Sequence, residues 1–282
     1  MATLEALPLR AYHEAVDLDR PFRPTRAPAP PHRLAELAET AVRLLGGRAG
    51  QSVRAVLTRR PPTPLDEEVA AVLDELLGGE RELRPRVDPL ALPVVAGAPP
   101  HTTVWQGDIT TVAADVIVNA ANSALLGCFR PMHDCVDNAI HAAAGPRLRA
   151  DCHTLMSAQG APERTGAAKI TRGYHLPARY VLHTVGPIVA GPVSTDDRRA
   201  LADSYRACLD LAAEVDPIRT IAFCGVSTGV FGFPKASAAE LALSTVEQWL
   251  DRHPGRFDRV VFTTFGDADH TAYLEHLTTW TR

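Results

Sequence analysis

Four continuous apolar runs in the last two thirds of the chain limit its fold more than any other feature. The runs are DVIVNAAN (115–122), RYVLHTVG (179–186), RTIAFCGV (219–226) and RVVFTTFG (259–266). A half-exposed strand alternates apolar and polar residues, whereas a strand covered on both faces is apolar throughout. Helical patterns separate the runs, at residues 136–144, 198–215 and 235–250. This alternation predicts an α/β domain with a buried mixed sheet.

The N-terminal third of the chain has a different character. Residues 21–31 (PFRPTRAPAPP) are too rich in proline for a regular helix or a central strand, so we expect an extended segment. Residues 32–47 then place apolar side chains at helical spacing and close on two glycines. Residues 65–77 repeat that pattern, and we expect this second helix to stop at Gly78 and Gly79.

A second proline-rich passage, residues 85–100, indicates a linker. It predicts a boundary between a proline-rich helical extension at 1–95 and the α/β domain at 96–282. The extension contains no cysteine and no clustered glycine loop, so we expect the chemistry to lie in the second part.

Composition excludes several classes of function. The formal net charge of -4 provides no basic excess for general nucleic-acid or membrane-surface binding. No run of about 18 apolar residues could span a membrane, and the first residues carry acids where a secretory signal has an apolar segment. We therefore expect the cytoplasm, where the five cysteines would be thiols or metal ligands rather than disulfides.

Two asparagines, Asn119 and Asn122, lie at the expected end of the first apolar run. An asparagine at a strand exit can simply satisfy a turn. Two amides in one strand-end loop favour the recognition of hydroxyl groups, because an amide both donates and accepts hydrogen bonds. Ligands of open α/β sheets bind beyond the carboxyl ends of the strands, which is where this pair is expected.

A glycine-rich loop, GVSTGVFGF at 225–233, lies between an expected strand and an expected helix. The backbone N–H groups of such a loop can bind phosphate. The GK[ST] ending of a P-loop is missing. The phenylalanines between the glycines must pack on something, either a sugar or base or the core.

Two thiols and an imidazole, from Cys128, His133 and Cys135, form a C-x4-H-x-C pattern. Three such ligands suit Zn²⁺, and three protein ligands with an open position are more typical of catalytic than of structural zinc. Residues two apart face opposite sides of a helix, so His133 and Cys135 could share a metal only where the stretch is irregular and the helix begins near Cys135. The alternative is two buried thiols and a surface histidine.

Single residues near these motifs have weaker interpretations. Asp137 follows the Cys-His pattern and could be a general base, or it could only favour the helix dipole. His183 lies within a buried run and indicates a core histidine, and Cys152 indicates a small apolar side chain in the core.

Six motifs taken together resemble the macrodomain family of ADP-ribose-binding proteins over about residues 103–268. They are GDIT (107–110), VNAAN (118–122), AAGP (143–146), TGAAKIT (165–171), YVLHTVGP (180–187) and STGVFGFP (227–234). The resemblance implies a three-layer α/β/α sandwich with a mixed central sheet, preceded by a small helical domain. Where hydrolases of the family have a glycine run leading to VDG, this chain has LGCFRPMHDCVDNAIH (126–141). That departure resembles the zinc-containing macrodomains, a microbial branch with a helical N-terminal extension.

The resemblance also assigns roles to the ligand-binding residues. Asp108 and Ile109 should meet the adenine, and Phe265 should stack on its ring. The diphosphate should lie against the backbone N–H groups of Ser227, Thr228, Gly229 and Val230. Phe231 should cover the distal ribose, and Asn119 and Asn122 should face its hydroxyl groups.

The resemblance places the chemistry beside that ribose. Asp137 aligns with the catalytic aspartate of the hydrolases, and Asn122 is taken as catalytic as well as substrate-binding. Cys128, His133 and Cys135 align with the zinc ligands.

The leading hypothesis is a zinc-dependent hydrolase that removes mono-ADP-ribose from a modified protein side chain, with an acidic side chain as the expected acceptor. Its partners would then be ADP-ribose and an ADP-ribosylated protein. The alternatives are a module that binds ADP-ribose without cleaving it, and a deacetylase of O-acetyl-ADP-ribose. A pure binding module has no need of a metal triad or of Asp137, which favours the enzyme.

Overall fold

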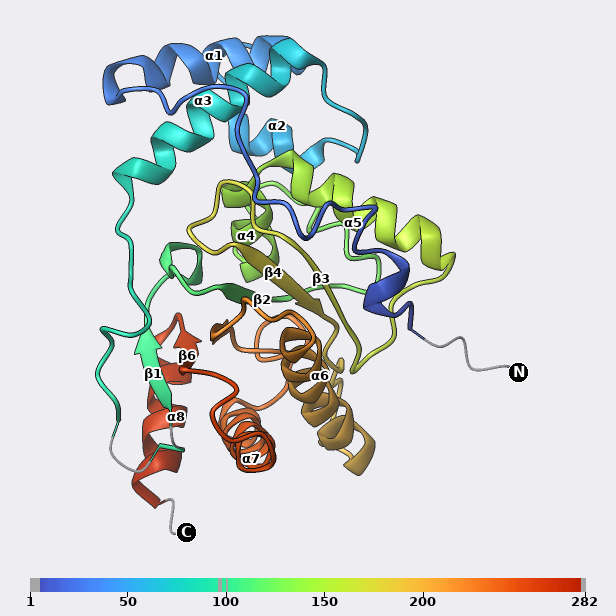
Figure 1. The fold of residues 1–282 in the computed structure, drawn as a ribbon, viewed down its shortest axis with the longest axis vertical. Coiled ribbons are helices and arrows are strands. Elements are labelled where there is room, and N and C mark those ends of the chain that lie inside the picture. The colour runs from blue at the N-terminus through green and yellow to red at the C-terminus, as the bar shows by residue number, and fades with distance from the viewer. Residues whose placement is uncertain (1–5, 96–97, 100, 280–282) are drawn as a thin grey trace.

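The computed structural model describes residues 6–95, 98–99 and 101–279, and its centre is a six-stranded sheet (Figure 1). The strands are β1 (Thr102–Gln106), β2 (Val116–Ala120), β3 (Ala168–Arg172), β4 (Tyr180–Thr184), β5 (Thr220–Phe223) and β6 (Arg259–Thr264). Their order in space is β1-β6-β5-β2-β4-β3. Neighbouring strands are parallel except β3 and β4, which are antiparallel. The sheet is therefore mixed, as the sequence predicts.

Helices cover both faces of this sheet (Figure 1). One layer contains α4 (Val136–Ala144) and α5 (Pro146–Gln159), and the other contains α6 (Thr195–Ala213), α7 (Lys235–Arg252) and α8 (Asp267–Thr279). Val116, Ile117 and Val118 of β2 are consequently fully buried, which explains why the run is apolar without alternation. The expected three-layer α/β/α architecture is confirmed.

A helical unit formed by residues 31–83 lies at the top of Figure 1. It consists of η2 (Pro31–Arg33), α1 (Leu34–Leu44), α2 (Val53–Arg59) and α3 (Glu67–Leu83). The unit has its own apolar cluster, which includes Leu37 of α1, Leu57 of α2, and Leu73 and Leu76 of α3. The sequence predicts α1 and α3, whereas the seven residues of α2 are too few to show a helical period.

The expectation that the second helix stops at Gly78 and Gly79 is wrong, because α3 continues to Leu83. The two glycines instead allow the extended segment at Pro28 and Ala29 to pack closely against α3. A Cβ atom on Gly79 would lie 2.4 Å from the carbonyl oxygen of Ala29, and one on Gly78 would lie 3.2 Å from the ring of Pro28. The reason for the glycine pair is therefore tertiary packing and not helix termination.

The first described residues pack on the α/β domain and not on the helical unit. Tyr12, Val16 and Leu18, which follow η1 (Leu9–Ala11), are buried in the large core that surrounds the sheet. The Tyr12 hydroxyl accepts a hydrogen bond of 3.1 Å from the backbone N–H of Ile170 in β3. A division of the chain at residue 95 stays a prediction. Residues 12–18 lie before that boundary but pack on the domain that follows it.

The helix expected at 198–215 begins earlier in the structure, at Thr195. Ser194 and Asp197 form a capping box, in which each side chain accepts a hydrogen bond from the backbone N–H of the other residue. Three further elements, α5, β3 and α8, were not predicted.

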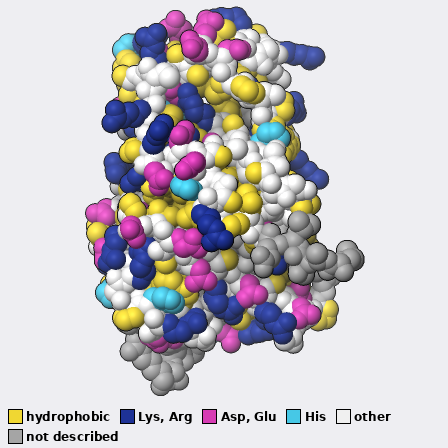
Figure 2. Space-filling model, turned by 45° about the vertical axis from the view of Figure 1, so that its right-hand side comes forward, with side chains coloured by type: hydrophobic (Ala, Val, Ile, Leu, Met, Phe, Trp, Pro, Cys, Tyr) yellow, Lys and Arg dark blue, Asp and Glu magenta, His cyan; other side chains and the backbone are white. Residues whose placement is uncertain are grey.

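Within the described residues, no helix combines the length and the apolar character needed to cross a bilayer. On the face shown in Figure 2, acidic and basic side chains are interspersed.

Candidate functional site

Most of the predicted site residues lie on three loops that leave the same edge of the sheet. Parallel strands end at one edge, so the loops that follow β2, β5 and β6 start side by side. The loop after β2 comprises residues 121–135 and is called the cluster loop below. It ends where α4 begins, and the loop after β5 ends at the start of α7.

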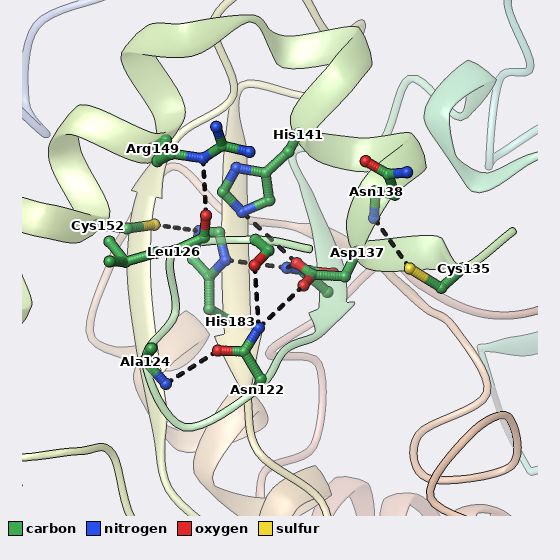
Figure 3. Close-up of polar contacts among 12 residues, drawn as sticks. Asn122, Ala124, Leu126, Cys135, Asp137, Asn138, His141, Arg149, Cys152 and His183 are labelled. Atoms are coloured by element: carbon green, nitrogen blue, oxygen red, sulfur yellow. Dashed lines mark hydrogen bonds and ion pairs between the residues drawn. The ribbon is translucent and has the colours of Figure 1, made fainter. Parts of the chain in front are cut away.

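Asp137 lies in the first turn of α4, with its carboxylate next to Asn122 (Figure 3). The residue is 5% exposed. Its Oδ1 accepts a hydrogen bond of 2.8 Å from Asn119 Nδ2, and its Oδ2 lies 3.5 Å from Asn122 Nδ2. Burial raises the pKa of Asp137 to about 6, although the Asn119 hydrogen bond and the Arg149 charge act in the opposite direction. The structure therefore brings together three residues that the resemblance places beside the distal ribose.

The side-chain oxygen of Asn119 accepts no hydrogen bond within the described residues. Its Nδ2 donates to Asp137 and lies 3.2 Å from Nδ1 of His183, whereas its buried Oδ1 has no partner among the described residues. A buried polar atom without a partner is destabilising by about 1–3 kcal/mol. A hydroxyl group of a ligand would supply the missing donor.

The Cys-His cluster, Cys128, His133 and Cys135, is assembled in the structure. The three ligand atoms all lie within 4.8 Å of one another, and Cys128 Sγ is 3.4 Å from His133 Nδ1. Cys135 is the N-cap of α4, and its Sγ accepts a hydrogen bond from Asn138 N. The stretch before α4 is irregular, so the geometric condition for a shared metal is met.

The donors of this cluster fit Zn²⁺. Two sulfur atoms and one imidazole nitrogen are ligands that zinc prefers, and all three residues are partly exposed. Burial raises the pKa of the Cys135 thiol to about 12, and the neighbouring Cys128 and Asp137 add to this effect. A bound cation reverses that preference, because a coordinating thiol loses its proton.

The loop after β5 has the features of an anion-binding loop. Ser227 has a positive φ of 64°, which a non-glycine residue adopts at a cost of about 1–3 kcal/mol. Its hydroxyl is buried and has no partner among the described residues. A Cβ atom on Gly229 would meet nothing within 4 Å, so the space in front of this residue is open. Val230 is 75% exposed.

Asp108 lies after β1, at the N-cap of η3 (Ile109–Thr111). Its Oδ1 accepts hydrogen bonds from the backbone N–H and the hydroxyl of Thr110, and its Oδ2 accepts one of 2.6 Å from Arg84. The side chain of Ile109 is buried, so only its backbone can face a ligand. Phe265, the residue after β6, is 74% exposed and free to stack on a ring.

Comparison with known proteins identifies the family. Residues 118–242 match the Macro domain family. A protein-ADP-ribose hydrolase of Treponema medium is 44% identical over 224 residues, which cover 78% of this chain and 84% of that protein. The chain belongs to the macrodomain family.

Two solved macrodomain structures resemble this one. The Trypanosoma brucei macrodomain in complex with ADP-ribose has a TM-score of 0.60 and 30% identity, and the match covers 80% of this chain and 96% of that one. A mutant Oceanobacillus iheyensis macrodomain with ADPR has a TM-score of 0.57 and 38% identity, with 63% and 92% covered.

This macrodomain has a second cluster of buried side chains, which contacts Asp137 through His141. His141, Cys152 and His183 have ligand atoms within 4.8 Å of one another. Burial lowers the pKa of His183 to about 3 and also lowers that of His141, so both rings are neutral. His183 Nε2 lies 3.0 Å from Thr171 Oγ1, and its Nδ1 faces Asn119. His183 is therefore a satisfied core histidine that also orients a residue of the site.

Three residues that contact the macrodomain site were not predicted. His141 lies four residues after Asp137 on α4, and its Nε2 is 3.5 Å from that carboxylate. The i, i+4 spacing was a usable signal. No sequence signal indicated Arg84 or Arg149, because their hydrogen-bond partners lie on elements that are distant in the sequence.

Proposed function

We propose that this macrodomain is a hydrolase that removes mono-ADP-ribose from a protein side chain, with Zn²⁺ bound at the Cys-His cluster. The name and the 84% coverage of the Treponema medium relative support the hydrolase class. The observation that carries the proposal is the buried Asn119–Asp137 pair, in a fold that binds ADP-ribose in related structures. Asp137 lies two residues after Cys135 of the cluster.

The nucleotide end of the site supports the ligand. The Asp108 carboxylate is partly exposed and can accept a hydrogen bond from the exocyclic amine of adenine. Phe265 offers a face for the ring. The mild negative charge of the protein cannot attract a diphosphate, so the backbone N–H groups of residues 227–230 and the Ser227 hydroxyl must do so.

The distal ribose would then lie against β2 and the cluster loop. The unpaired Oδ1 of Asn119 accepts a hydrogen bond from a ribose hydroxyl, which satisfies that buried atom. Asn122 is held by two backbone contacts, donating to Gly127 O and accepting from Ala124 N. Its amide is therefore fixed beside Asp137, where it orients either the ribose or the attacking water.

In the hydrolytic step, a water oxygen bonds to the anomeric carbon of the distal ribose, and the bond from that carbon to the acceptor oxygen breaks. Asp137 Oδ2 takes one proton of the water, because its contact with Asn122 Nδ2 is long, at 3.5 Å, whereas Oδ1 accepts the shorter Asn119 hydrogen bond of 2.8 Å. An acidic acceptor leaves as a carboxylate and needs no proton. Such a leaving group makes an aspartate or glutamate acceptor the best match to a site with one carboxylate base.

Zinc would be held by Cys128, His133 and Cys135, and when bound it lowers the pKa of a coordinated water to about 7 or polarises an oxygen of the substrate. Without these ligands the chain would retain the adenine and diphosphate contacts.

The test follows free ADP-ribose after the protein is mixed with a mono-ADP-ribosylated acidic peptide, with chelator, and after zinc is restored. We expect release that stops with chelator and returns with zinc. Binding of ADP-ribose without release from acidic or other acceptors would identify a binding module. O-Acetyl-ADP-ribose, assayed in parallel, tests the deacetylase alternative.

A further inference from the structure

The cluster loop has no strand or helix of its own. Besides a few backbone hydrogen bonds, such as that from Glu163 N to Ser123 O, side chains hold its backbone in place. Asn138 Nδ2 lies 3.3 Å from Arg130 O and 3.1 Å from His133 O. Arg149 Nε donates a hydrogen bond of 2.7 Å to Leu126 O, two residues before the first cysteine (Figure 3). These contacts fix both ends of the segment that carries the Cys-His cluster.

Arg149 also reaches the N-terminal helical unit. Its Nη1 donates to Leu57 O at 2.9 Å and to Arg60 O at 2.5 Å. Both carbonyls lie at the C-terminal end of α2, where the last carbonyl groups of a helix lack the usual i+4 partner. Leu57 O also accepts a hydrogen bond of 3.2 Å from Arg60 N, so Arg149 adds a second donor there. One guanidinium thus joins α2 to the cluster loop.

The charge of Arg149 suits this position. The residue is 5% exposed, and the hydrogen bonds given above all go to backbone carbonyl oxygens. The C-terminal end of a helix carries a partial negative charge, which favours a cation there. The guanidinium also lies 4.4 Å from the centre of the Phe129 ring, within the cluster loop.

We propose that α2 supports the cluster loop through Arg149, so that the helical unit helps to fix the position of the Cys-His cluster. Arg149 is then a positioning residue, because it acts on the Cys-His cluster through the loop backbone. Groups that orient metal ligands commonly change metal affinity about 10–100-fold when they are mutated.

Arg147 provides a matched control two residues away on the same helix. It also links α5 to the helical unit, but its partner is Asp74 of α3 and not the cluster loop. Arg149→Lys keeps the charge and loses the planar fork that bonds two segments at once, and Arg147→Lys makes the same change at the other link. Calorimetry with ADP-ribose checks that both variants are folded.

The first readout is hydrogen–deuterium exchange of residues 121–135 in chelator-treated protein, which requires no metal. Arg149→Lys should speed exchange in this segment at least several-fold, and Arg147→Lys should not. Equal exchange in the two variants would overturn the proposal.

The second readout is zinc affinity, measured by competition with a chelator, and it rests on the zinc binding proposed above. Arg149→Lys should weaken affinity about 10–100-fold, with Arg147→Lys close to the parent. If the parent binds no zinc while Arg149→Lys still loosens the loop, the support by α2 stands and the proposed zinc site fails.

A second pair of variants tests α2 itself, in case Arg149→Lys does not fold. Leu57→Ala and Leu37→Ala each remove a buried leucine from the same apolar cluster, on α2 and α1 respectively. Only the α2 variant should speed exchange in the cluster loop. The same exchange in both would contradict the proposal.

Discussion

Replacing Asp74 with asparagine should loosen the helical unit from the rest of the molecule. Asp74 lies in α3, and its carboxylate is completely buried. Its Oδ2 accepts hydrogen bonds of 2.7 and 2.8 Å from the backbone N–H and hydroxyl of Thr25. Its Oδ1 accepts from Arg147 of α5, and at 3.0 Å from His175 Nε2. One side chain therefore joins three distant segments.

Arg147 also donates a hydrogen bond of 3.2 Å to Oδ2, so an asparagine at position 74 must turn its NH2 group toward at least two donors, whichever way it is oriented. Each lost hydrogen bond to a charged acceptor contributes about 1.5–3 kcal/mol, and breaking a buried ion pair by removing one partner costs about 3–5 kcal/mol. The hydrogen-bond estimate and the ion-pair estimate therefore agree that Asp74→Asn lowers the free energy of unfolding by about 3–5 kcal/mol.

The stability difference between the parent and Asp74→Asn should decrease as the pH falls. Burial alone would raise the pKa of Asp74, but hydrogen bonds from His175, Arg147 and Thr25 outweigh it and hold the pKa well below its usual range. The unfolded chain has a carboxyl pKa of about 3.9. A lowered folded pKa gives stability that is complete above the unfolded value and is lost as the pH falls toward the folded one.

Urea unfolding followed by circular dichroism, from pH 3 to pH 8, measures both effects. The parent should exceed Asp74→Asn by a constant margin above about pH 5, and the margin should shrink below about pH 4. Glu68→Gln, an exposed change on the same helix, should stay within about 0.5 kcal/mol of the parent. A margin under about 1 kcal/mol, or one that does not change with pH, would refute the reasoning.

Three further variants test the site. Asp137→Asn should cut the rate of ADP-ribose release about 10²–10⁴-fold in a timed assay, with zinc content nearly unchanged, and full activity would exclude Asp137 as the base. Cys135→Ala should lose the near-stoichiometric zinc expected in the parent by elemental analysis, and should abolish turnover while ADP-ribose binding suffers much less. Asp108→Ala should weaken ADP-ribose binding by about 1.5–3 kcal/mol in calorimetry, and an unchanged affinity would mean that the adenine lies elsewhere.

The sheet and its edge could be predicted because they depend on local patterns. The run around Ile117 is apolar since both faces of β2 are covered. Asn119 lies near the end of that strand, and Asn122 lies two residues beyond it. The irregular stretch that ends at Cys135 was expected only on the condition that His133 and Cys135 share a metal, because residues two apart face opposite sides of a helix.

The errors and omissions have a tertiary cause. The pair Gly78 and Gly79 resembles a helix end, but its reason is the passage of the segment at Pro28. Arg149 bonds carbonyl groups of residues about 90 positions away, and backbone carbonyls carry no sequence signal. Bound zinc, an acidic acceptor and a cytoplasmic location stay predictions.

The most direct test of the account is a single turnover in H₂¹⁸O, followed by mass spectrometry of the acceptor peptide. Attack at the anomeric carbon predicts that the peptide loses its ADP-ribose and regains its original mass without ¹⁸O. Incorporation of ¹⁸O into the carboxyl group of the peptide would show attack at the ester carbonyl instead. An acceptor that keeps its ADP-ribose while the protein binds free ADP-ribose would contradict the hydrolase itself.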